Sequence, residues 1–225
     1  MAYQEQPERV RRASFGTITG ELSGTLLGKV FALLSFSLAF AAVGGVVGAA
    51  LGPSWMLPLL LVEFGLIFAV QGLRNREGIN LVLLYAFALV SGMTLGPIIM
   101  AYVGAGLGSV VLQAATMTAV MTVGLSVYAL STKRDLSGLQ PYLFMGVIGL
   151  VGAMILNIFV GGGALSMAIS WGGALIFSVL LVFEVNRIRY VPDTMGNAVV
   201  ITLSIYLTII NLFLFLLRIF GGSRR

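Results

Sequence analysis

Two acidic residues lie inside long apolar segments, where a carboxylate is costly to keep. Glu184 follows Leu-Leu-Val-Phe in the stretch LLVFEVNRIRYV, and Glu63 lies in an equally apolar stretch eleven residues before Arg74. An ionisable side chain in such surroundings must be neutral, paired or in contact with water, and it indicates a functional site. Two structural explanations compete with function: Glu184 could pair with Arg187 one helical turn away, and Glu63 could be a protonated acid hydrogen-bonded between helices.

The residue types present exclude several kinds of enzyme. The chain contains no cysteine and no histidine, so zinc sites built from those ligands and Ser-His-Asp triads are excluded. An aspartyl protease needs two carboxylates that share a proton, and a membrane acid without a partner acid does not meet that requirement. We therefore expect no enzymatic activity, no catalytic residues and no cofactor.

Neutral oxygen atoms in the last apolar segment favour ion permeation instead. Thr208 and Asn211 are three residues apart, so they share one face of a helix. Carboxylate, hydroxyl and amide oxygens that converge between helices suit a hard cation such as calcium. Glu184 and Glu63 would then be the carboxylates that contact the ion.

The composition indicates that these residues belong to an integral membrane protein. Of the 225 residues, 59% are hydrophobic and 9% are charged, whereas soluble domains carry about 25% charged residues. The lipid bilayer is therefore the expected partner of most of the surface. The net charge of +5 is better explained by the orientation of the chain in the membrane than by binding to nucleic acid, because so little of the chain meets water.

Seven apolar segments have the length of membrane-spanning helices, about 20 residues each. They predict an all-α bundle of transmembrane helices at residues 26–50, 55–73, 80–103, 108–131, 141–160, 165–187 and 197–219. The first segment is too long for the core of a secretory signal and follows a polar stretch, so we expect it to be retained. The predicted organisation is a cytoplasmic N-terminal tail at 1–25, a transmembrane domain at 26–221 and a short C-terminal tail at 222–225.

Basic residues alternate between the loops and predict the orientation of the chain. Basic residues flank the start of the first segment, lie between the second and third and between the fourth and fifth, and end the sixth. The loops at 51–54, 104–107 and 161–164 contain neither. Since basic loops stay in the cytoplasm, the N-terminus should lie there. Seven crossings then place the C-terminus outside, even though Arg218, Arg224 and Arg225 lie near that end.

Glycine, with 29 residues, occurs at small-xxx-small spacing in several apolar segments. In lipid, such pairs let two helix backbones approach closely, so we expect them to pack helices together. The pairs are Gly44/Gly48, Gly48/Gly52, Gly92/Gly96 and Gly104/Gly108.

Four stretches of the chain resemble the Bax inhibitor-1 family, also called the transmembrane Bax inhibitor motif family. They are YAFALVSGMTLGPII (85–99), LNIF (156–159), FSVLLVFEVNRI (177–188) and LSIYLTIINLFLFLLRIFG (203–221). The similarity extends over all seven segments and is closest to bacterial members regarded as pH-sensitive calcium leaks. It implies a fold in which the last helix is central and ringed by the other six.

The resemblance also implies roles for individual residues. The family has two aspartates, on the sixth and seventh helices, that share a proton and latch the pore, and their positions match Glu184 and Thr208. The family's membrane glutamate on the second helix matches Glu63. Its arginine at the end of that helix, which can pair with the acid of the sixth helix, matches Arg74. Because Thr208 has no carboxyl group, Glu184 loses its acid partner and a calcium site would be weakened.

These observations predict a cation leak channel of the bacterial inner membrane or a related endomembrane, with calcium as the first candidate ion. Glu184 would be the gate acid, with Arg74 as its cationic partner. Glu63 would contact the ion in mid-membrane, and Thr208 and Asn211 would supply neutral oxygens. The alternative is a non-conducting regulator, such as a modulator of a membrane protease, that acts through the N-terminal tail on a membrane-protein partner. We expect a monomer or a weak oligomer.

Overall fold

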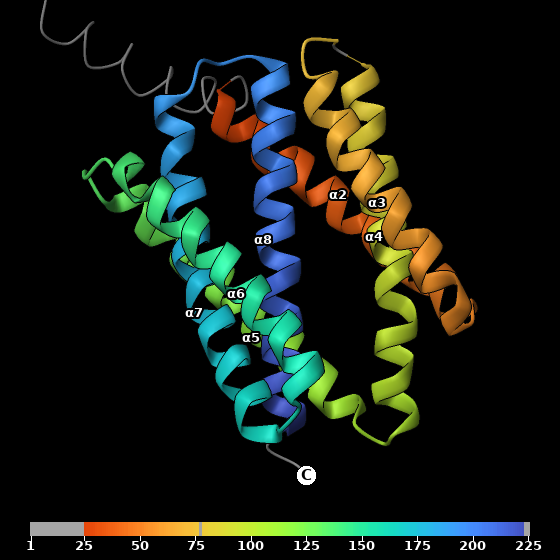
Figure 1. Ribbon diagram of the computed structural model, residues 1–225. Coiled ribbons are helices and arrows are strands. Elements are labelled where there is room, and N and C mark those ends of the chain that lie inside the picture. The colour runs from red at the N-terminus through yellow and green to blue at the C-terminus, as the bar shows by residue number, and fades with distance from the viewer. Residues whose placement is uncertain (1–24, 77, 223–225) are drawn as a thin grey trace, which may run out of the picture.

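The computed structural model describes residues 25–76 and 78–222, so nearly all of the two predicted tails lies outside the described residues. The described residues form seven α-helices and three 3-10 helices (Figure 1). The α-helices are α2 (Leu26–Ala49), α3 (Met56–Gly72), α4 (Ile79–Gly104), α5 (Gly108–Ser131), α6 (Gln140–Val160), α7 (Gly163–Arg187) and α8 (Met195–Gly222). The 3-10 helices are η1 (Pro53–Trp55), η2 (Ser137–Leu139) and η3 (Ile188–Tyr190).

The predicted fold class, an all-helical polytopic membrane protein, is confirmed. Each predicted segment coincides with one helix, and the boundaries agree within a few residues. Six of the described helices are long and apolar enough to cross a membrane, and α3, with 17 residues, is apolar but shorter. Large apolar side chains are exposed on many of these helices, as expected where the surrounding solvent is lipid rather than water.

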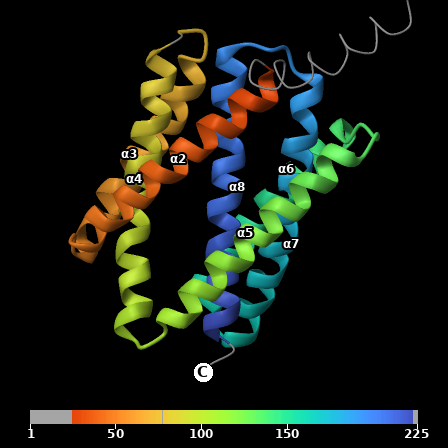
Figure 2. The same ribbon diagram turned by 180° about the vertical axis from the view of Figure 1, so that it is seen from behind.

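Helix α8 occupies the centre of the bundle (Figures 1 and 2). It packs against α2, α3, α4, α5 and α7. Two thirds of its most apolar stretch, 67%, is buried, compared with 6% for the stretch that contains α6. The ring around α8 is therefore less regular than the family resemblance implies, because α6 packs mainly against α7 at the outside of the bundle.

Glycines bring α2 and α4 into backbone contact, as their spacing predicted. A side-chain carbon added at Gly92 would lie 2.8 Å from Cα of Ala41, and one added at Gly48 would lie 2.6 Å from Cα of Met93. Only glycine leaves room for such an approach. The prediction is wrong for the Gly104/Gly108 pair, because an added carbon at Gly104 would meet nothing within 4 Å. It is also wrong for the Gly48/Gly52 pair, because Gly52 lies after the end of α2 and an added carbon there would meet only the Ser54 hydroxyl, at 3.9 Å.

Apart from the α2–α3 connection, the turns between helices lie toward two ends of the bundle (Figures 1 and 2). One end holds the start of α2 and the connections α3–α4, α5–α6 and α7–α8 (Figures 1 and 2). The other end holds the connections α4–α5 and α6–α7 and the end of α8. The described part of the chain therefore begins and ends on opposite sides of the bundle.

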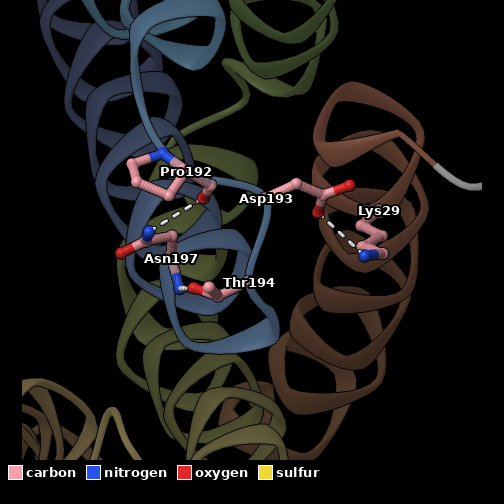
Figure 3. Close-up of polar contacts among 5 residues, drawn as sticks. All are labelled: Lys29, Pro192, Asp193, Thr194 and Asn197. Atoms are coloured by element: carbon pink, nitrogen blue, oxygen red, sulfur yellow. Dashed lines mark hydrogen bonds and ion pairs between the residues drawn. The ribbon is translucent and has the colours of Figure 1, made fainter.

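A polar cluster ties the loop before α8 to the start of α2 (Figure 3). Nζ of Lys29 lies 2.8 Å from Oδ1 of Asp193, and both side chains are partly exposed. Asn197 donates its side-chain N–H to the carbonyl of Pro192 at 2.9 Å and its backbone N–H to Oγ1 of Thr194 at 3.2 Å. These bonds hold the loop before α8 in the conformation in which Asp193 meets Lys29.

Candidate functional site

Glu184 and Thr208 meet between α7 and α8. Oγ1 of Thr208 donates a hydrogen bond to Oε2 of Glu184 at 2.8 Å. The exposed fraction is 9% for Glu184 and 1% for Thr208. Helix α7 is the neighbour against which α8 packs most extensively, so two long helices hold the contact in place. The two positions at which the family resemblance implies a pair of aspartates are therefore adjacent, with a carboxylate on one helix and a hydroxyl on the other.

The cations near Glu184 lie further away than the hydroxyl. Arg187, one turn along α7, interacts with the carboxylate electrostatically but is itself exposed. Arg74 lies in the turn after α3, where its backbone carbonyl accepts a hydrogen bond from Asn80 at 3.0 Å. Among the described residues the only ion pair is Lys29–Asp193, so the structure does not bring Arg74 or Arg187 into an ion pair with Glu184.

Glu63 lies in a second polar cluster, between α3, α4 and α8. Its half-buried carboxylate faces the hydroxyls of Ser91 and Thr94 on α4, although the Thr94 hydroxyl donates to the carbonyl of Val90 in its own helix at 3.2 Å. Tyr206 of α8 approaches the same cluster and interacts with both Ser91 and Glu63. Its hydroxyl is buried and forms no hydrogen bond with the described residues.

Helix α8 separates the two acids. Tyr206 and Thr208 are two residues apart, which turns their side chains by about 200° around an α-helix. Tyr206 therefore faces Glu63 on one side of α8 while Thr208 faces Glu184 on the other. The oxygen atoms expected to converge form two separate clusters, and no group of three or more acidic side chains occurs within residues 25–76 and 78–222.

Asn211 belongs to neither cluster. It lies three residues after Thr208, and its side-chain N–H donates to the carbonyl of Leu207, in its own helix, at 2.8 Å. Asn211 is thus close to Thr208 along the helix but does not bond to Glu184 in this conformation.

Asn186 is a further polar residue of the site that the sequence analysis missed. Its side chain is buried, accepts a hydrogen bond from the N–H of Leu136 at 3.3 Å, and approaches the carbonyls of Ala129 and Arg134 at 3.4 and 3.3 Å. These contacts fasten the α5–α6 connection to α7 two residues from Glu184. The sequence does contain a signal for it, because Asn186 is a second polar residue, two positions after Glu184, in the apolar stretch FEVN.

Comparisons with known proteins agree over almost the whole chain. The sequence profile of the family described as "Inhibitor of apoptosis-promoting Bax1" matches residues 24–225. An uncharacterized membrane protein of Vibrio cholerae is 34% identical over 213 residues, which cover 91% of this chain and 95% of that protein. The uncharacterized protein Cj0236c of Campylobacter jejuni is 33% identical over 212 residues, or 90% of each chain. An uncharacterized protein of Caulobacter vibrioides is 39% identical over 191 residues, which cover 71% of this chain and 76% of that protein.

Proposed function

Because this chain belongs to the Bax inhibitor-1 family of membrane proteins, we propose that it provides a slow cation leak across a bacterial inner membrane, with calcium as the first candidate ion. The observation that carries the proposal is the buried bond between the Glu184 carboxylate and the Thr208 hydroxyl, which joins α7 to the central helix. A carboxylate inside a membrane bundle is costly and is kept for a function by default. This one lies where the resemblance implies the pore latch.

In this proposal an apolar layer seals the bundle beyond the latch. Phe215 lies seven residues after Thr208, about 10 Å along α8, and its ring stacks on that of Phe177 of α7 with centroids 5.7 Å apart. A side-chain carbon at Gly173 would lie 2.5 Å from the Phe215 ring, so the ring fills the space between the two helices. An ion passes only when α7 and α8 separate at Glu184 as well as at Phe215.

The second cluster would contact the ion at another depth. Glu63 has hydroxyl groups around it rather than cations, so its carboxylate has no fixed counter-charge among the described residues. A passing cation could supply that charge, with the unpaired Tyr206 hydroxyl as an additional oxygen ligand. We place the end that holds the start of α2 in the cytoplasm, because the basic loops gather there.

Calcium should enter liposomes that contain the purified protein faster than it enters protein-free liposomes. The driving force is the calcium gradient alone, because a leak needs no energy source. A calcium-sensitive dye inside the vesicles measures the rate, with potassium and protons tested in separate assays. Flux equal to that of protein-free liposomes across the pH range would contradict the leak and favour the non-conducting regulator.

Replacing Glu63 by glutamine should lower the calcium flux about tenfold, which corresponds to about 1.4 kcal/mol in the barrier. The amide keeps the shape of the side chain but removes the charge that attracts the ion. Asp135→Asn is the matched control, because Asp135 is exposed in the α5–α6 connection and bonds from the Ser137 hydroxyl and N–H lower the pKa of its carboxyl. The control removes one negative charge outside the bundle and should leave flux unchanged.

Unchanged flux in Glu63→Gln together with a higher unfolding temperature would contradict a role in permeation. Glu63 would then be only a buried polar group whose desolvation cost is relieved by the amide.

A further inference from the structure

A cavity lies at the end of the bundle where α8 ends, remote from the Glu184–Thr208 contact. Its volume is about 640 Å³, and it opens to the surroundings between α4, α6, α7 and α8. Its polar lining comes from Tyr102, Asn157, Ser166, Ser170 and Arg218, and small or apolar residues form the rest of the wall. None of the polar clusters described above contributes to it.

The charge of this cavity is positive. Among the residues that the structure describes, Arg218 is the one charged residue that lines it, and no acidic side chain does. Within the described part of the chain Arg218 forms no ion pair. Glu184 lies on α7 fourteen residues from Ser170 of the cavity wall, about 21 Å along the helix. Glu63 lies on α3, which does not line the cavity, and Asp135 and Asp193 lie in connections at the opposite end of the bundle. The guanidinium therefore lacks a counter-charge among the described side chains.

Hydrogen-bond donors surround the same space. The amide group of Asn157 bonds to the hydroxyl of Ser166 at 3.0 Å, which fixes both side chains in the wall. Helix α7 begins at Gly163 in the wall, and no side chain caps this end, so its first N–H groups have no acceptor within the helix. A guanidinium group, which presents several N–H donors in one plane, binds the oxygens of a phosphate well when neutral donors lie beside it.

We propose that this cavity is an anion-binding site for a phosphate group, held by the Arg218 guanidinium with Asn157 and the first turn of α7 as further donors. The phosphate belongs either to the headgroup of an anionic phospholipid or to a soluble phosphate ester. The cavity lies at the level of the helix ends, where headgroups are found, and its wall of alanine, leucine, methionine and glycine accepts the apolar part of a lipid. This site is independent of the proposed ion leak.

The experiment compares the full-length protein in lipid nanodiscs of phosphatidylcholine with and without phosphatidylglycerol. Native mass spectrometry measures the retained phosphatidylglycerol, and thermal unfolding measures the protection that it gives. Arg218→Gln should lower the retention of phosphatidylglycerol about tenfold, which corresponds to a loss of about 1.4 kcal/mol in binding free energy. Arg218→Lys should keep part of the retention, because it keeps the positive charge. Arg76→Gln is the matched control, because Arg76 is exposed at the opposite end of the bundle. This variant should retain as much phosphatidylglycerol as the parent.

A second arm adds inorganic phosphate or glycerol 3-phosphate to protein in phosphatidylcholine nanodiscs. Protection by these soluble probes, lost in Arg218→Gln, supports the site and assigns it to a soluble phosphate. Protection by phosphatidylglycerol alone supports the site and assigns it to the headgroup. Equal protection of Arg218→Gln and the parent, or no effect of any probe on the parent, would overturn the proposal. Unfolding temperatures in phosphatidylcholine alone show whether each variant is folded.

Discussion

Gly92→Ala should destabilise the protein by about 3 kcal/mol or more, at the upper end of what overpacking costs. The added methyl carbon would lie 2.8 Å from Cα and 2.7 Å from the carbonyl carbon of Ala41. Both are backbone atoms, so no rotamer change relieves the contact, and α2 must move away from α4. This separation would spread along the interface, because Gly48 and Gly96 are in equally close contact with the opposite backbone.

The matched control is Gly124→Ala, in the interior of α5. A carbon added there meets nothing within 4 Å, and alanine favours a helix over glycine by up to about 1 kcal/mol. Unfolding temperatures of the two variants in the same detergent give the comparison, with Gly92→Ala strongly lowered and Gly124→Ala equal to the parent or higher. Similar temperatures for both variants would show that α2 and α4 do not depend on this close approach.

Thr208→Asp should give the protein a steep pH response in calcium flux between roughly pH 6 and 8, the range in which a coupled acid pair can titrate. The Thr208 hydroxyl is 2.8 Å from a carboxylate oxygen of Glu184, so an aspartate at 208 places two carboxyl groups within bonding distance. Such a pair shares a proton and titrates in two coupled steps. Loss of the shared proton leaves like charges on α7 and α8, which weakens the contact between these helices.

Flux and unfolding temperature, each measured against pH, test this expectation. The unfolding temperature of Thr208→Asp should fall as pH rises, since repulsion replaces the shared proton. Adding Glu184→Gln should remove both pH effects, because an amide cannot share the proton. Thr208→Val keeps the shape of the side chain without a titrating group and serves as the control. A pH profile of Thr208→Asp that matches the parent would show that residues 184 and 208 do not act together.

The sequence was sufficient to predict the helices, because bilayer thickness sets the length of each apolar segment. It also predicted that Gly44, Gly48, Gly92 and Gly96 pack helices, since their spacing needs no knowledge of the partner. The identity of the partner was not predictable: Gly92 and Gly48 meet each other's helices only because the fold places α2 beside α4.

The neighbours of Glu63 were beyond sequence reasoning for a similar reason. Helices that are apolar all round carry no amphipathic stripe to fix their rotation, so the sequence could not assign Tyr206 to one acid and Thr208 to the other. Tyr206 and Thr208 face different acids because their side chains are about 200° apart around α8. The packed bundle sets which acid each of them faces. The contact between Glu184 and Thr208 was anticipated through the family resemblance alone.

The central position of α8 has a consequence for biogenesis, because this helix follows the other six described helices in chain order. During synthesis the earlier helices enter the bilayer before the helix that fills their common core exists. The α2–α4 pair can form through its glycines without α8, whereas α5 and α7 gain their packing partner in the core only when α8 is present. The core of the bundle is therefore complete only after α8 has joined the helices that precede it.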